Sequence, residues 1–142
     1  MPYASATQVA AGGAMRNRRV LVVDDYHDAR ELLVEWLDGL GYEPIPASDG
    51  VEALAILARG MDPALMLLDL RMPVMDGWTF MEIAGERQLL AHTEVWVTSA
   101  AESAEPPAGT HGVLPKPLDL EELARLVARV CGPARAATGD NT

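Results

Sequence analysis

Five residues of types that handle phosphate and metal ions stand at the ends of short apolar runs. Asp24 and Asp25 follow "RVLVV", Asp69 follows "LMLL", Thr98 closes "TEVWVT" and Lys116 follows "GVLP". A carboxylate is among the groups that are most costly to bury unpaired, so a buried run that ends on one needs an explanation. We interpret the apolar runs as strands that carry these groups to a common rim.

Three gathered carboxylates predict a cation site. Two of them about 5 Å apart repel by about 3 kcal/mol at an effective dielectric near 20, so three require counter-charges or a raised pKa. Lys116, the only lysine of the chain, supplies one positive charge. Mg²⁺ prefers oxygen ligands and leaves room for phosphate oxygens. Asp24, Asp25 and Asp69 are therefore candidate magnesium ligands, and Asp69 is a candidate nucleophile that attacks phosphorus and becomes an aspartyl phosphate.

The elements that would position these groups follow from the periodicity. Expected strands cover residues 19–25, 42–47, 64–70, 93–100 and 112–117, and expected helices cover residues 28–42, 48–60, 77–90 and 118–130. Asp28 is a candidate cap of the first helix, and Asp119 with Glu122 forms a candidate capping box of the last. The alternation predicts an α/β fold, a doubly wound five-stranded parallel sheet, whose sites form at the carboxyl ends of the strands.

Composition limits the class of protein. The chain has 142 residues, and its formal net charge of -10 argues against nucleic acid as a direct partner. Its single cysteine excludes an internal disulfide, and it has no apolar run long enough for a membrane span and no pattern of a signal peptide. We expect a cytoplasmic protein with a flexible N-terminal tail (1–17), one domain (18–131) and a flexible C-terminal tail (132–142).

The segments "VLVVDD", "LMLLDLRMPVMDG", "VTSA" and "LPKP", in this order at successive strand ends, resemble the receiver domain of two-component response regulators. Taken singly, Asp24–Asp25 would also fit a helix cap, Thr98 an ordinary strand end and Lys116–Pro117 an ordinary turn. The resemblance covers nearly all of residues 18–131 and implies a flavodoxin-like receiver fold.

The resemblance also implies roles for the matching residues. Asp69 would be the phosphoacceptor, and Mg²⁺ would be bound by Asp25, Asp69 and the backbone carbonyl of Arg71, with Asp24 acting largely through metal-bound water. Lys116, preceding a cis proline, would hold a phosphoryl oxygen, and Thr98 would move to report phosphorylation. The phosphoryl donor would be a sensor histidine kinase or a histidine phosphotransfer protein. The partner that receives the signal would be an unknown downstream protein. The protein would catalyse only its own phosphorylation and dephosphorylation.

The chain departs from the family at three places. Val113 stands where receivers usually carry an aromatic switch residue. Pro106–Pro107 interrupt the segment between Thr98 and Lys116, so the fourth helix of the doubly wound order should be shortened or irregular. Arg71 and Ala100 hold the positions that in the family flank the path of attacking water, so they are expected to tune the lifetime of the phosphoryl group.

Other functions remain open from the residues. An aspartyl-nucleophile phosphatase would need an acid two residues after Asp69, where this chain has Arg71, and a substrate cap for which no insert is long enough. A flavin or nucleotide module would need a Gly/Ser/Thr-rich loop after the first strand, where this chain has "DDYHDA". The chain would also fit a receiver fragment of a larger DNA-binding regulator.

Overall fold

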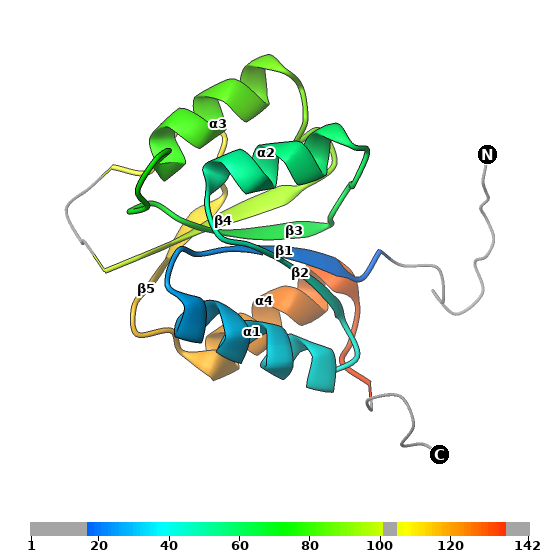
Figure 1. The fold of residues 1–142 in the computed structure, drawn as a ribbon. Helices are drawn as coiled ribbons and strands as arrows, with labels where there is room; N and C mark the ends of the chain where they lie inside the picture. Colours follow the sequence, from blue (N-terminus) through cyan, green and yellow to red (C-terminus); the bar gives the residue numbers. More distant parts are fainter. Residues whose placement is uncertain (1–16, 101–104, 136–142) are drawn as a thin grey trace, which may run out of the picture.

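A five-stranded parallel sheet forms the centre of the computed structural model, which describes residues 17–100 and 105–135 (Figure 1). The strand order is β2-β1-β3-β4-β5, and every neighbouring pair is parallel. The elements are β1 (Arg19–Val23), α1 (His27–Gly39), β2 (Glu43–Ala47), α2 (Gly50–Ala58), β3 (Leu65–Asp69), α3 (Gly77–Glu86), β4 (Glu94–Ser99), β5 (Gly112–Pro115) and α4 (Leu120–Cys131). The predicted doubly wound α/β fold is confirmed.

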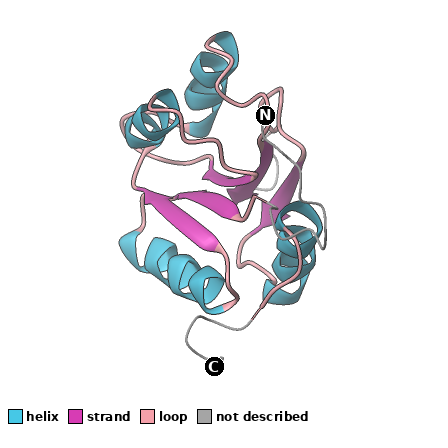
Figure 2. Ribbon diagram, turned by 90° about the vertical axis from the view of Figure 1, so that its right-hand side faces the viewer, coloured by secondary structure: helices cyan, strands magenta, loops and turns pink. Residues whose placement is uncertain are grey.

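Helices cover both faces of the sheet, with α1 and α4 on one side and α2 and α3 on the other (Figures 1 and 2). Successive strand residues point to opposite faces, so the four apolar residues of β1 divide between two cores. Val20 and Val22 pack with α1 and α4, whereas Leu21 and Val23 pack with α2 and α3. Burial on both faces explains why β3 is apolar at every position before Asp69 and why β1 is apolar after Arg19.

The predicted N-terminal cap is confirmed for the last helix and wrong for the first. Asp119 caps α4, where its side chain accepts hydrogen bonds from the backbone N–H groups of Glu121 and Glu122. The prediction that Asp28 caps the first helix is wrong, because α1 begins one residue earlier, after Tyr26, and no side chain caps it. Asp28 instead lies in the first turn, where an acid interacts favourably with the helix dipole.

The connection between β4 and β5 contains no helix in its described part, residues 105–111. Pro107 is buried there, and its carbonyl accepts hydrogen bonds from the backbone N–H and the hydroxyl of Thr110. The Pro106–Pro107 pair predicted this outcome, since proline removes a donor and clashes with the preceding turn. Residues 101–104 lie outside the described residues.

Strand β2 forms one edge of the sheet, and prolines occupy its outward-facing positions. The Glu43 N–H donates to the Arg18 carbonyl, and the Ala47 carbonyl accepts from the Asp24 N–H, so residues 43, 45 and 47 face β1. Alternation then turns Pro44 and Pro46 outward. Because proline has no N–H group, the free edge lacks donors at both positions.

The predicted tails lie outside the described residues, apart from residue 17 and residues 132–135. Among the described residues after α4, the Arg135 N–H donates to the Leu40 carbonyl at 2.8 Å. No helix among the described residues combines the length and apolarity that are needed to cross a membrane.

Candidate metal and phosphoryl site

Asp24 and Asp25 leave the sheet together and differ in burial. Strand β1 ends at Val23, so both residues lie just beyond its carboxyl end, where Asp24 is buried and Asp25 is exposed. One carboxylate oxygen of Asp24 (Oδ1) accepts the backbone N–H of Tyr26 at 2.9 Å, and its backbone carbonyl accepts a hydrogen bond from the Arg30 guanidinium at 2.8 Å. These bonds fix the inner carboxylate and leave the outer one facing solvent.

Asp69 is the last residue of the fully buried strand β3, and its exposed fraction is 5 %. It pairs in register with Thr98 of β4, which is also buried. The Oδ1 atom of Asp69 accepts the backbone N–H of Arg71 at 3.2 Å. The predicted acceptor carboxylate and the predicted switch hydroxyl are therefore on neighbouring strands at the same edge of the sheet.

Lys116 completes the cluster from the end of β5. Its backbone N–H donates to the Ser99 carbonyl at 3.0 Å, and the Lys116–Pro117 peptide bond is cis, as the resemblance implied. Its ammonium nitrogen, Nζ, lies 3.3 Å from Asp24 Oδ2 and 3.6 Å from Asp69 Oδ2. The structure thus brings together four of the predicted side chains around one point, with Thr98 beside them in the sheet.

The electrostatics of this site favour a divalent cation. One carboxylate oxygen from each of Asp24, Asp25 and Asp69 lies within 4.8 Å of the others. Burial raises the pKa of Asp69 from 3.8 to about 6; Lys116 and the Arg71 N–H act in the opposite direction, and the charges of Asp24 and Asp25 add to the increase. One ammonium does not neutralise three carboxylates, and an all-oxygen donor set that is partly open to solvent fits Mg²⁺.

A tight backbone approach shapes the loop that follows Asp69. The Gly77 N–H donates to the Leu70 carbonyl at 3.0 Å. A Cβ atom at Gly77 would lie 2.6 Å from Leu70 Cδ2 and 2.9 Å from Leu70 Cα. Only glycine allows α3 to begin this close to the strand end. The close approach closes the loop of residues 70–76 beside the carboxylates.

Arg71 and Trp78 form a contact at the rim of the site that the sequence did not reveal. The guanidinium carbon of Arg71 lies 5.6 Å from the centroid of the Trp78 ring, and the Trp78 indole N–H donates to the Glu105 carbonyl at 2.9 Å. The two residues are seven positions apart across an irregular loop, and Glu105 is 27 residues further on. No periodicity links such positions, so only the folded structure brings them together.

An apolar hollow of about 560 Å³ adjoins Asp24 and Lys116. Its walls come from α1 and from the turn between β5 and α4, and include Tyr26, Leu32, Trp36, Pro117 and Leu120. Tyr26 and Leu32 are among the most exposed large apolar residues described, at 63 % and 67 %. Apolar area of this kind beside a polar cluster is typical of a contact surface.

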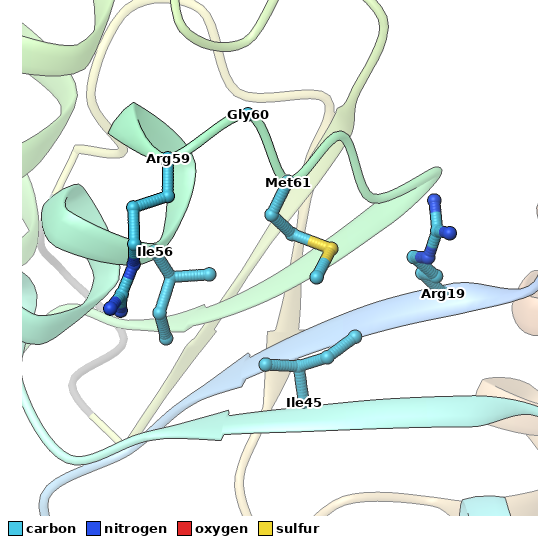
Figure 3. A pocket seen from close by; sticks show the side chains of 6 residues that line it. All are labelled: Arg19, Ile45, Ile56, Arg59, Gly60 and Met61. Carbon is cyan, nitrogen blue, oxygen red and sulfur yellow. The ribbon is translucent and has the colours of Figure 1, made fainter.

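A separate hollow lies far from the carboxylates in the fold, between α2 and the β1–β2 side of the sheet (Figure 3). It measures about 450 Å³ and is lined by Arg19, Ile45, Ile56, Arg59, Gly60 and Met61. The guanidinium groups of Arg19 and Arg59 lie on opposite sides of it (Figure 3). None of the carboxylates that could hold a metal lines this hollow, so it is separate from the candidate metal site at the strand ends.

Comparison with known proteins agrees with this geometry. The sequence model of the response regulator receiver domain matches residues 20–128. The Regulator of RpoS from Escherichia coli K12 is 37% identical over 116 residues, which are 78% of this chain and 34% of that protein. Sporulation initiation phosphotransferase F from Bacillus subtilis is 33% identical over 120 residues, or 81% of this chain and 94% of that one. The chain thus spans about a third of the Escherichia coli relative.

Solved structures show the same likeness. The receiver domain of the hybrid histidine kinase CckA superposes with a TM-score of 0.66 at 34% identity, covering 78% of this chain and 96% of that one. The chemotaxis response regulator CheY4 of Vibrio cholerae gives a TM-score of 0.70 at 31% identity, covering 80% of this chain and 98% of its own.

Proposed function

Because the chain belongs to the response regulator receiver family, we propose that it is the phosphoacceptor of a two-component phosphorelay in the cytoplasm. A carboxylate oxygen of Asp69 forms a bond to phosphorus, and the bond between phosphorus and the donor's imidazole nitrogen breaks, leaving its electron pair on that nitrogen. The observation that carries the proposal is the position of Asp69, buried at a strand end, 3.6 Å from the Lys116 ammonium and beside two further carboxylates.

Each neighbouring residue has a task in this reaction. The Lys116 ammonium group forms ion pairs with both Asp24 and Asp69, so it can bind a phosphoryl oxygen as negative charge is transferred to the site. The hydroxyl group of Thr98, one strand away, is the candidate donor to another phosphoryl oxygen. Burial limits the access of water to the acyl phosphate once it has formed.

The carboxylates of Asp24, Asp25 and Asp69 and the backbone carbonyl of Arg71 would hold Mg²⁺. When bound, the ion would offset the charge of the carboxylates and of the incoming phosphoryl group. The raised pKa of Asp69, about 6, still leaves this carboxylate mostly ionised at pH 7 and able to act as a nucleophile. Asp25 is exposed, so the ion can reach the site from solvent.

The phosphoryl donor is a histidine kinase or a histidine phosphotransfer protein. Relatives of the chain include part of the sensor histidine kinase RcsC of Salmonella typhi, 37% identical over 114 residues. The apolar hollow formed by α1 and the β5–α4 turn gives a protein donor a surface beside Lys116. The downstream partner is then a protein rather than nucleic acid, since the net charge of -10 disfavours a phosphate backbone.

Labelling with radioactive acetyl phosphate and Mg²⁺ tests the proposal. We expect one phosphoryl group per chain, labile to base and hydroxylamine, with no label in Asp69→Asn or in excess chelator. Asp76→Asn is the matched control, because Asp76 caps α3 and asparagine caps a helix equally well. Label that persists in Asp69→Asn contradicts the assignment, and rapid multiple turnover of phosphate esters would instead indicate a phosphatase.

Phosphoryl transfer from a protein donor tests whether the apolar hollow binds the donor, separately from the reaction at Asp69. Leu32→Asp places a charge on the apolar surface and should slow transfer from a phosphohistidine protein while labelling by acetyl phosphate stays unchanged. Equal slowing with both donors would show that the hollow is not a donor surface.

A further inference from the structure

The side chain of Arg71 lies between two possible partners, the Trp78 ring and a phosphoryl group on Asp69. Its backbone N–H already donates to Asp69 Oδ1 at 3.2 Å, so the residue begins beside the atom that would carry the phosphoryl group. Its guanidinium lies over the Trp78 ring at 5.6 Å, and within the described residues it makes no ion pair or side-chain hydrogen bond. A phosphoryl group on Asp69 would therefore offer it an anionic partner that the free protein lacks.

Trp78 links this arginine to the connection between β4 and β5. One face of its ring carries the guanidinium, and its indole N–H donates to the Glu105 carbonyl at 2.9 Å. The same connection touches α3 again one turn later, since a Cβ at Gly109 would lie 3.3 Å from Met81 Cε. Residues 105–111 therefore rest on α3 at Trp78 and Met81.

Val113 in β5 offers no polar side-chain contact that could report the state of the Asp69 site to the β4–β5 connection, so another residue must do so. Val113 is exposed and carries only methyl groups, so it makes no polar bond that could change with the state of the site. Trp78, by contrast, has one contact on the side of Asp69 and one on the β4–β5 connection.

We propose that Arg71 exchanges between Trp78 and a phosphoryl group on Asp69, so that Trp78 transmits the occupancy of the site to the β4–β5 connection through Glu105. The inference rests on the proposed function. A guanidinium bonds phosphate in a bidentate, charge-assisted manner, which is stronger than its contact with the face of a half-buried indole such as Trp78. Phosphorylation therefore removes Arg71 from Trp78, leaves one face of the indole uncovered and loosens the bond to Glu105.

The indole N–H of Trp78 provides the readout. Trp78→Phe assigns its resonance among the three tryptophans of the chain. With Mg²⁺ and beryllofluoride, a phosphoryl mimic, we expect hydrogen exchange at this N–H to rise about two- to fivefold, the factor that corresponds to an exposed cation–π contact. Binding of the mimic itself is followed independently by the fluorine resonance of bound beryllofluoride.

Arg71→Gln removes the guanidinium and keeps a polar side chain. Exchange at the Trp78 N–H should then be raised without the mimic, and beryllofluoride should add nothing further. Arg87→Gln is the matched control, since Arg87 is exposed at the C-cap of α3 and should respond as the unmodified protein does.

The outcomes separate the two proposals. Bound beryllofluoride with unchanged exchange at Trp78 refutes the role of Arg71 and leaves the proposed function standing. A response at Trp78 that survives Arg71→Gln also refutes it. Absence of the bound fluorine signal overturns the proposed function, and this signalling route falls with it because it has no input.

Discussion

The carboxylate of Asp69 should make the metal-free protein less stable at neutral pH, and Asp69→Asn should relieve this cost. Burial is the main reason that its pKa rises from 3.8 to about 6. In the unfolded chain the group returns to its ordinary pKa. Between these two pH values the folded state binds more protons than the unfolded state, so stability falls as pH rises.

The size of the effect follows from the two pKa values. The difference between 3.8 and about 6 corresponds to about 3 kcal/mol, and solvent at the open edge of the site reduces this to about 1–2 kcal/mol. The cost is small at pH 4, develops mainly between pH 4 and pH 6, and is complete above pH 7. Asparagine keeps an acceptor for the Arg71 N–H, and Lys116 keeps Asp24 as its partner.

Urea unfolding followed by circular dichroism, in excess chelator at five pH values from 4 to 8, measures this difference. We expect Asp69→Asn to be more stable by about 1–2 kcal/mol at pH 8 and to differ from the unmodified protein by less than about 0.5 kcal/mol at pH 4. Asp28→Asn is the control, and its loss of a favourable helix-dipole contact should reduce stability by about 0.3–1 kcal/mol at pH 8. A difference that is independent of pH, or a less stable Asp69→Asn at pH 8, would refute the reasoning.

The remaining predictions concern the cation and the loop. Mg²⁺ at about 100 times its dissociation constant should stabilise the protein by about 2.7 kcal/mol, and Asp25→Asn should remove most of this gain in the same urea assay. Gly77→Ala should cost about 1–3 kcal/mol, because its Cβ would meet Leu70 backbone and side chain below 3.0 Å. Gly85→Ala, with nothing within 4 Å of its Cβ, should instead raise the melting temperature, since alanine favours a helix by about 1 kcal/mol.

The proximity of the candidate site residues could be predicted from the sequence because a parallel sheet brings together residues that follow successive strands. Asp24 and Asp69 each follow an apolar run, and pairing of those runs in parallel places their carboxyl ends side by side. Pro106–Pro107 predicted a shortened or irregular helix for an equally local reason, and residues 105–111 contain none. Motifs of this kind are visible without coordinates because their meaning depends on neighbours in the sequence.

Contacts between loops were not predictable in this way. Arg71 and Glu105 lie on irregular backbone, where no period relates sequence to direction, and both meet Trp78 at the start of α3. Helix ends failed for a related reason. The helix expected over 77–90 ends at Glu86, and Gln88 adopts a φ of 57°. Leu89 and Leu90 still pack on the core. The apolar pattern therefore continues past the end of the helix, which is why the sequence predicted a longer one.

The two prolines of β2 have a consequence for how copies of this protein meet. An added strand would have to bond to the backbone of Pro44 and Pro46, and neither residue has a hydrogen to give. Strand addition at this edge would lack two hydrogen bonds, which disfavours extension of the sheet by a second molecule there. Self-association of this chain is therefore expected to use side chains on helices and loops, or the opposite edge of the sheet at β5, in preference to β2.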